Sequence, residues 1–287
     1  MVPTPSDPAL QKAAIVESWN TVAPQWDEWT PVVDAWFAPA TARMMDALGL
    51  RPGTSVLELA AGSGGFTRYL AEAVGPGGRV VATDSGPEMV RLAARNAARS
   101  GWTQVEARVM DGEAPDVPAD SFDALACRQA FMFFADPARA LARLRGTLRP
   151  EGRAVVSVFS EPERNAVIAM PMEVLAKFTA APGAPSPARG GPGPFSLGDP
   201  GKLEQMFRGA GFSDVRTERV PCPLRMPSAT DLVRFLREIV LGKLEELPAE
   251  DRARAVRELT ERAALFVDPR GPGGPCELLV VSGRRPA

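Results

Sequence analysis

The chain has 287 residues, enough to bury a substantial hydrophobic core in one large domain or two smaller ones. Its 33 basic residues nearly balance its 35 acidic residues, so the net charge gives no case for binding to nucleic acid or to an anionic membrane. The chain contains no histidine, which excludes a Ser-His-Asp hydrolase and a histidine-ligated metal enzyme.

The cysteines do not indicate a disulfide framework or a structural zinc site. Cys127, Cys222 and Cys276 are odd in number, lie far apart in the sequence and form no C-x-x-C pair. The N-terminal sequence has no basic start followed by an apolar block, and no apolar run reaches the length of a membrane helix. We therefore expect a cytoplasmic protein with no metal and no membrane span.

Residues 1–48 are predicted to form a helical cover made of short helices. Pro24, Pro31 and Pro39 interrupt the helical pattern, and a proline inside a helix removes one hydrogen bond and clashes with the preceding turn. Helices this short do not hold together alone, so their order must come from docking onto the rest of the protein. Four of the five tryptophans lie in this segment, at positions 19, 26, 29 and 36.

Residues 49–160 are predicted to form an α/β core. The expected strands are 54–59, 79–84, 105–111, 121–129 and 152–160, and the expected helices are 65–74, 86–101 and 136–148. Strands that alternate with helices indicate a Rossmann-like, doubly wound and mainly parallel sheet that is covered on both faces.

The rest of the chain is predicted to return to the sheet twice and to add to the cover. The expected elements are helix 164–178, loop 179–195, helix 199–212, strand 213–224, helices 228–247 and 249–267, and strand 276–285. The sheet would then have seven strands. Residues 161–227 form a cover insertion and a return to the sheet, residues 228–268 a helical cover insertion, and residues 269–287 the final strand. The helical pair either completes an apolar pocket or is purely structural.

A glycine turn, LELAAGSGG, follows the first predicted strand and is expected to approach a ligand. Gly62 and Gly64 allow close backbone contact, and the helix that follows begins with free N–H groups. A dinucleotide fingerprint would need a third small residue where Thr67 stands, and a phosphate loop would need a lysine that is missing. Glu58 instead favours a cation, and S-adenosylmethionine carries both an ammonium and a sulfonium group.

Four motifs in order resemble the class I methyltransferases that use S-adenosylmethionine, most closely the small-molecule group related to ubiquinone/menaquinone biosynthesis. The resemblance runs from about Val56 to Phe159, and Ala60 departs from it because many members have glycine there. The motifs are VLELAAGSGG, VVATDSGPEM, VMDGEAPDVPADSFDALACRQAFMFFADPARAL and LRPEGRAVVSVF.

The resemblance implies a role for each matching residue in binding S-adenosylmethionine. Glu58 and the backbone around Ala60, Gly62 and Gly64 would face the methionine part, and Arg128 would pair with the cofactor carboxylate. Asp84 would accept both ribose hydroxyls. Ser85 and Met89 would flank the adenine, Asp111 would accept from the adenine amino group, and Gly112 would give a backbone contact. Asp84 and Asp111 could instead be ordinary acids at strand ends. Arg128 could equally pair with Glu58.

The substrate is expected where the fourth strand ends and where the cover passes over it. The resemblance places Gln129, Phe131 and Phe134 near the methyl group, although core packing is the alternative for the phenylalanines. Trp19 and Trp26 would contact the substrate, or would only attach the cover to the body. No catalytic base can be named.

The predicted activity is methyl transfer to a small, apolar or aromatic metabolite by in-line displacement, with catalysis mainly by proximity and desolvation. The product would be S-adenosylhomocysteine. One alternative is a protein that binds S-adenosylmethionine and catalyses another reaction such as cyclisation, or only binds it. A nucleic-acid methyltransferase ranks third, since no target-base motif follows the fourth strand. The partner is therefore a small molecule, and the oligomeric state stays open.

Overall fold

A seven-stranded sheet forms the centre of the computed structural model, which describes residues 8–179, 191–240, 244 and 246–287. The strand order is β3-β2-β1-β4-β5-β10-β6. The strands are β1 (Ser55–Leu59), β2 (Arg79–Asp84), β3 (Val105–Val109), β4 (Phe122–Arg128), β5 (Leu148–Phe159), β6 (Ser213–Pro221) and β10 (Glu277–Arg284). The strands β1 to β5 run parallel, and β10 lies antiparallel between β5 and β6. The predicted fold class is confirmed.

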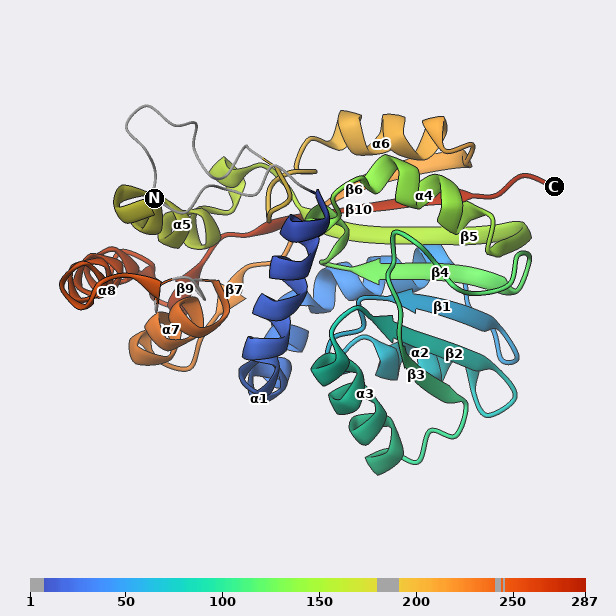
Figure 1. Ribbon diagram of the computed structural model, residues 1–287, viewed down its shortest axis with the longest axis horizontal. Coiled ribbons are helices and arrows are strands. Elements are labelled where there is room, and N and C mark those ends of the chain that lie inside the picture. The colour runs from blue at the N-terminus through green and yellow to red at the C-terminus, as the bar shows by residue number, and fades with distance from the viewer. Residues whose placement is uncertain (1–7, 180–190, 241–243, 245) are drawn as a thin grey trace.

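Helices cover both faces of this sheet, with α4 and α6 on one face and α2 and α3 on the other (Figure 1). Their bounds are α2 (Thr67–Val74), α3 (Pro87–Arg99), α4 (Pro137–Arg145) and α6 (Pro200–Gly209). Local sequence explains where two of them begin. The Asp136 carboxylate accepts a hydrogen bond from the N–H of Arg139 at 3.0 Å, and the Asp199 carboxylate accepts one from the N–H of Gly201 at 2.8 Å.

The N-terminal segment is a single helix, α1 (Pro8–Leu48), of 41 residues. The prediction that its prolines divide it into short helices is wrong. Pro24, Pro31 and Pro39 are all exposed and are spaced by seven and eight residues, so they recur on the side of the helix that faces solvent. Water can satisfy the carbonyls that they leave unpaired there, while the opposite side stays packed.

The second half of α1 belongs to the main hydrophobic core. Val33, Trp36, Phe37 and Met44 are almost completely buried. The Trp36 indole stacks on Phe37 with ring centroids 4.4 Å apart, and its N–H donates to the carbonyl of Cys222 at 2.8 Å. This half of the helix is therefore an integral part of the fold.

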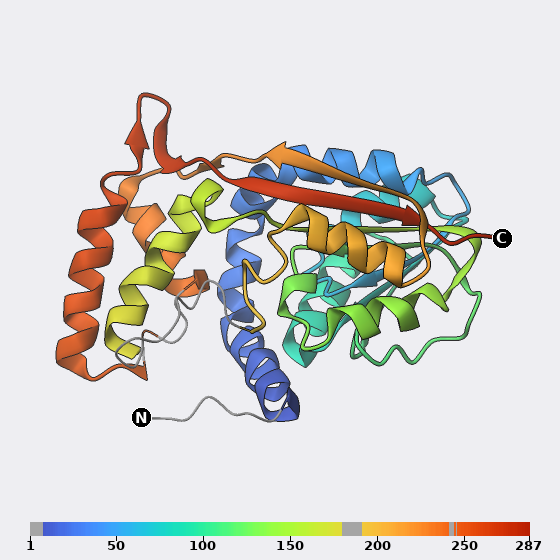
Figure 2. The same ribbon diagram turned by 90° about the horizontal axis from the view of Figure 1, so that it is seen from above.

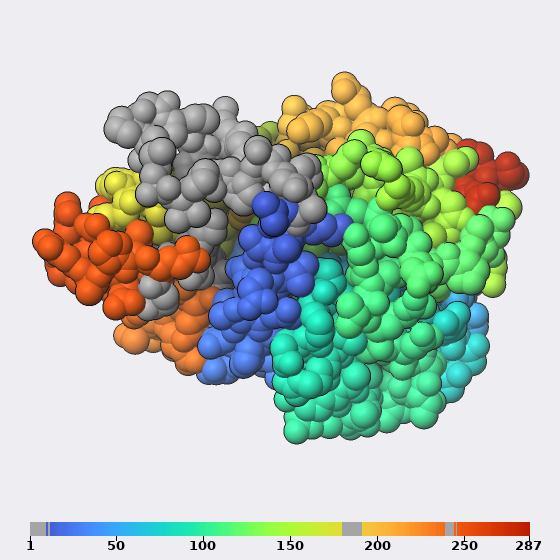
Figure 3. Space-filling model, in the orientation of Figure 1, coloured from blue at the N-terminus to red at the C-terminus, as the bar shows by residue number. Residues whose placement is uncertain are grey.

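A group of helices packs on the other side of α1, so that α1 runs between this group and the sheet (Figures 1 and 2). The group consists of α5 (Ala166–Thr179), α7 (Ala229–Phe235) with a π-helical continuation (Leu236–Val240), and α8 (Ala249–Ala263). Figure 3 shows α1 at the surface in this position. The hydroxyl of Ser228 caps α7 by accepting from the N–H of Asp231 at 3.0 Å, at the start of the predicted helix 228–247, but the change to π-helix after Phe235 was not predicted.

Some short elements lie outside the predictions. A three-stranded sheet has the order β7-β9-β8, with β7 (Leu224–Arg225), β8 (Val267–Asp268) and β9 (Gly271–Gly274). Strands of two to four residues are too short to carry an alternation of apolar and polar residues that could reveal them. Most of the predicted loop 179–195 lies outside the described residues. No helix within the described ranges is long and apolar enough to cross a membrane.

Candidate active site

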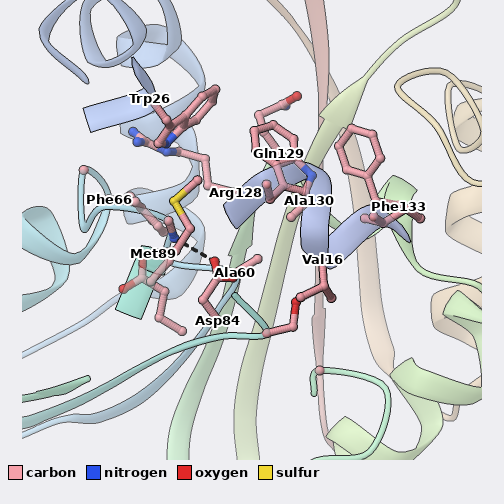
Figure 4. Close-up of a pocket in the computed structure, with 18 of the residues that line it drawn as sticks. Val16, Trp26, Ala60, Phe66, Asp84, Met89, Arg128, Gln129, Ala130 and Phe133 are labelled. Atoms are coloured by element: carbon pink, nitrogen blue, oxygen red, sulfur yellow. Dashed lines mark hydrogen bonds between the residues drawn. The ribbon is translucent and has the colours of Figure 1, made fainter. Parts of the chain in front are cut away.

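A cavity lies at the carboxyl ends of β1, β2 and β4, where the strand order reverses, and α1 passes over it. Trp26, Phe66 and Met89 lie on one side of it, and Gln129, Ala130 and Phe133 lie on the other (Figure 4). The residues that line it are Lys12, Ile15, Val16, Trp19, Trp26, Thr30, Val33, Phe37, Glu58, Ala60, Ala61, Gly62, Gly65, Phe66, Asp84, Ser85, Met89, Asp111, Gly112, Glu113, Arg128, Gln129, Ala130, Phe133 and Phe134.

The glycine turn forms the floor of this cavity. Ala60 and Gly62 have φ angles of 51° and 58°, in the left-handed region, and both line the cavity. A Cβ atom at Gly62 would lie 3.0 Å from the indole nitrogen of Trp26, so glycine lets α1 approach the turn. Gly64, with a φ of 92°, does not line the cavity and packs against Ala93 of α3 instead. Its role is to shape the turn.

Replacing Ala60 with glycine is expected to raise the free energy of unfolding by about 1 kcal/mol, because alanine is strained at a positive φ and glycine is not. Chemical denaturation would measure this gain. Ala61→Gly is the matched control, since Ala61 has no positive φ and should lose stability on the same change. A loss of stability in Ala60→Gly would contradict the strain at this position.

Glu58 lies at the end of β1 and is 1% exposed. Burial raises the pKa of its carboxyl from 4.5 to about 7. A hydrogen bond from the Thr67 hydroxyl, 2.6 Å long, and the charge of Arg128 oppose the rise in pKa, whereas Asp84 adds to it. The cavity therefore contains an acid that changes charge near neutral pH in a chain without histidine.

Asp84 lies at the end of β2 with both carboxylate oxygens fixed by backbone. The N–H groups of Gly62 and Gly86 donate to it at 3.0 and 2.8 Å. Burial raises the pKa of this carboxyl, although both hydrogen bonds oppose the rise. Each oxygen keeps a further lone pair for a ligand hydroxyl. Ser85 and Met89 line the cavity beside it.

Asp111 lies in the part of the cavity that the resemblance assigned to the adenine. The N–H of Glu113 donates to one of its oxygens at 2.9 Å, and the ammonium group of Lys12 on α1 donates to the other. Lys12 also pairs with the Glu113 carboxylate at 2.8 Å. Glycine is required at position 112, between Asp111 and Glu113, because a Cβ there would lie 2.7 Å from the Phe134 ring. Lys12 was not predicted, since nothing local to it indicates a partner 99 residues away.

Arg128 ends β4 and pairs with α1. Its guanidinium donates to the Asp34 carboxylate at 2.9 Å and to the Thr41 hydroxyl at 3.2 Å, and its centre lies 5.2 Å from the Phe66 ring centroid. The alternative pairing with Glu58 is not what the structure shows, because Glu58 is hydrogen-bonded to Thr67. Arg128 still lines the cavity, so it can reach a ligand while it is anchored to α1.

Aromatic rings of α1 and of the segment after β4 border the cavity. Trp19 contacts Trp26 and Phe133 edge to face, with ring centroids 5.3 and 5.8 Å apart. Gln129 and Phe134 also line the cavity. Phe131 is completely buried against Phe134 and lies outside the lining, so Phe133 takes the position expected for it.

Comparison with known proteins identifies the family. Residues 56–152 match the methyltransferase domain family. A nocamycin O-methyltransferase from Saccharothrix syringae is 35% identical over 241 residues, which cover 79% of this chain and 85% of that relative. The chain belongs to the S-adenosylmethionine-dependent methyltransferases.

The methyltransferase also matches a ubiquinone/menaquinone biosynthesis C-methyltransferase of Hahella chejuensis, with 32% identity over 139 residues. That match covers 48% of this chain and 55% of the relative, about half of each. Among solved structures, that of the cyclase SpnF covers 94% of this chain and 97% of its own, with a TM-score of 0.57 and 16% identity. At this identity the likeness shows the fold alone. The predicted family and its resemblance are confirmed.

Proposed function

We propose that this methyltransferase transfers the methyl group of S-adenosylmethionine to an oxygen of a small, apolar or aromatic metabolite. The observation that carries the proposal is a cavity whose lining combines acids suited to the cofactor with aromatic rings. Glu58, Asp84 and Asp111 supply the carboxylates, and Trp19, Trp26 and Phe133 supply the rings. The O-methyltransferase relative supports oxygen as the acceptor.

The donor set fits the cofactor at each end. Two backbone N–H groups hold the Asp84 carboxylate, and its remaining lone pairs would accept from the two ribose hydroxyls. Glu58 offers a buried carboxylate to a cationic group, and Arg128 offers a guanidinium to a carboxylate. S-adenosylmethionine supplies an electrophilic methyl group on a sulfonium for in-line displacement. The protein would contribute position, orientation and the exclusion of water, to which α1 adds because its residues from Lys12 to Phe37 line the cavity.

Calorimetry and product analysis test this proposal. We expect one site for S-adenosylmethionine per chain, no comparable site for NAD, and methylated products when metabolite extracts are incubated with methyl-labelled cofactor and examined by mass spectrometry. Asp84→Ala is the control, because methyl transfer that takes place in this cavity should be lost or strongly reduced in this variant. Tight NAD binding without S-adenosylmethionine binding would overturn the cofactor. A changed product that carries no label would favour the alternative, a non-methylating reaction such as cyclisation.

A further inference from the structure

Gln129 is held in a strained backbone conformation directly after β4. Its φ angle is 61°, in the left-handed region that side-chain-bearing residues seldom adopt. The neighbouring strand β5 maintains this conformation through Ser157, which is completely buried. The N–H of Gln129 donates to the Ser157 carbonyl at 2.9 Å, and its side-chain nitrogen lies 3.3 Å from the Ser157 hydroxyl. Strain that the surrounding structure enforces is typical of functional sites.

The side-chain oxygen of Gln129 is buried without a hydrogen-bond partner among the described residues. An unpartnered acceptor that is removed from water is unfavourable, so a native fold seldom keeps one without a use. The other such atoms belong to Gln25, Arg145 and Arg225, and none of these residues lines the cavity. Gln129 does line it, beside Ala130 and Phe133 (Figure 4).

We infer that Gln129 is a positioning residue whose side-chain amide turns toward the bound substrate, so that its oxygen accepts a hydrogen bond from a substrate hydroxyl group. The inference rests on the proposed function and adds that the substrate carries a hydroxyl group on the side that faces Gln129. Of its neighbours in the lining, Ala130 and Phe133 offer no side-chain hydrogen-bonding group, and Arg128 offers only donors, which already bind Asp34 and Thr41. The contact fixes how an otherwise apolar molecule lies against the aromatic rings.

This arrangement makes Gln129 a determinant of specificity. A site built to hydrogen-bond a substrate hydroxyl rejects an analogue without it, because the buried polar group is then left unpaired. A methyl ether lacks the hydrogen that Gln129 requires, so a hydroxylated aromatic molecule should bind about tenfold more tightly than its methyl ether.

Two small aromatic probes test the inference in the presence of S-adenosylhomocysteine. Binding of 2-naphthol and of 2-methoxynaphthalene is measured by the change in tryptophan emission, to which Trp19 and Trp26 contribute in the cavity. The wild-type protein should prefer 2-naphthol about tenfold. Gln129→Met keeps the length of the side chain and removes the acceptor, so it should bind both probes within about twofold of each other.

Gln104→Met is the matched control, because the Gln104 side chain donates to the Ala71 carbonyl at 3.1 Å and lies outside the cavity. It should keep the preference for 2-naphthol and lower the melting temperature. Gln129→Met should change the melting temperature less than Gln104→Met does, because it removes an unpaired buried acceptor along with the long 3.3 Å contact from the side-chain nitrogen to Ser157.

The outcomes separate this inference from the proposed function. If Gln129→Met keeps the preference for 2-naphthol, Gln129 has a structural role only. If the wild-type protein binds S-adenosylhomocysteine and neither probe, the assignment of this side of the cavity to aromatic hydroxyls is overturned. Failure to bind S-adenosylhomocysteine would refute the proposed function instead.

Discussion

Replacing Asp84 with alanine is expected to weaken binding of S-adenosylmethionine about a hundredfold. A carboxylate that accepts two ribose hydroxyls makes two charge-assisted hydrogen bonds, each contributing roughly 1.5–3 kcal/mol, of which part is regained by water. The substitution also frees the N–H groups of Gly62 and Gly86, so the turn loses the anchor that shapes it. Calorimetry with S-adenosylmethionine would measure the loss.

Asp123→Ala is the matched control for this prediction. The Asp123 carboxylate also accepts a hydrogen bond from a backbone N–H, that of Ser55, at 2.8 Å. It lies at the amino ends of β1 and β4, whereas the cavity lies at the carboxyl ends of these strands. Affinity for S-adenosylmethionine should be unchanged in Asp123→Ala. Unchanged affinity in Asp84→Ala would show that Asp84 is only an acid at a strand end.

Replacing Glu58 with glutamine is expected to stabilise the protein without cofactor at pH 8, by at most about 3 kcal/mol. The folded protein raises the pKa of Glu58 from 4.5 to about 7, so between these values it holds a proton that the unfolded chain has released. The free energy of unfolding therefore falls as the pH rises from 4.5 to 7 and stays low above that. Glutamine is neutral throughout, so the two proteins should be equally stable near pH 4.

The same substitution is expected to remove a pH dependence of cofactor binding. The positive groups of S-adenosylmethionine favour ionised Glu58, so wild-type affinity should rise about tenfold between pH 6 and pH 8 relative to the affinity of Glu58→Gln. The comparison cancels the titration of the cofactor itself, because both proteins bind the same molecule. Calorimetry at several pH values measures it.

Thr67→Val is the control for the pKa of Glu58. It removes the hydrogen bond that favours the ionised carboxyl, so the pH midpoint of the affinity change should move higher. Parallel pH profiles in wild type and Glu58→Gln would mean that Glu58 does not titrate against the cofactor.

Local signals were sufficient to predict most of the core and the acids of the site. Asp136 followed by Pro137 marks the start of α4, and the structure shows both the cap and the helix. Glu58 and Asp84 could be placed together because parallel strands end at one edge of the sheet, and both line the cavity.

Contacts made by α1 could not be predicted in the same way. Lys12 and Asp34 meet their partners 99 and 94 residues away, and no spacing in the sequence reports such pairs. The prolines misled for a related reason. A rule based on local sequence treats each proline as the end of a helix, but it leaves out tertiary packing, and here the buried Trp36 and Phe37 stabilise the continuous helix.

The prolines of α1 have a consequence for the order of events in turnover. Each lacks an N–H, so the carbonyls of Asn20, Asp27 and Ala35 receive no helical hydrogen bond from four residues ahead, and the helix can pivot there. Lys12 and Trp19 lie before the first pivot, whereas Trp36 is anchored after the second. Swinging the first turns outward would expose the part of the cavity around Asp111 without disturbing the core. Steady-state kinetics should then be ordered, with cofactor entering before substrate and S-adenosylhomocysteine leaving last, at a rate set by this swing.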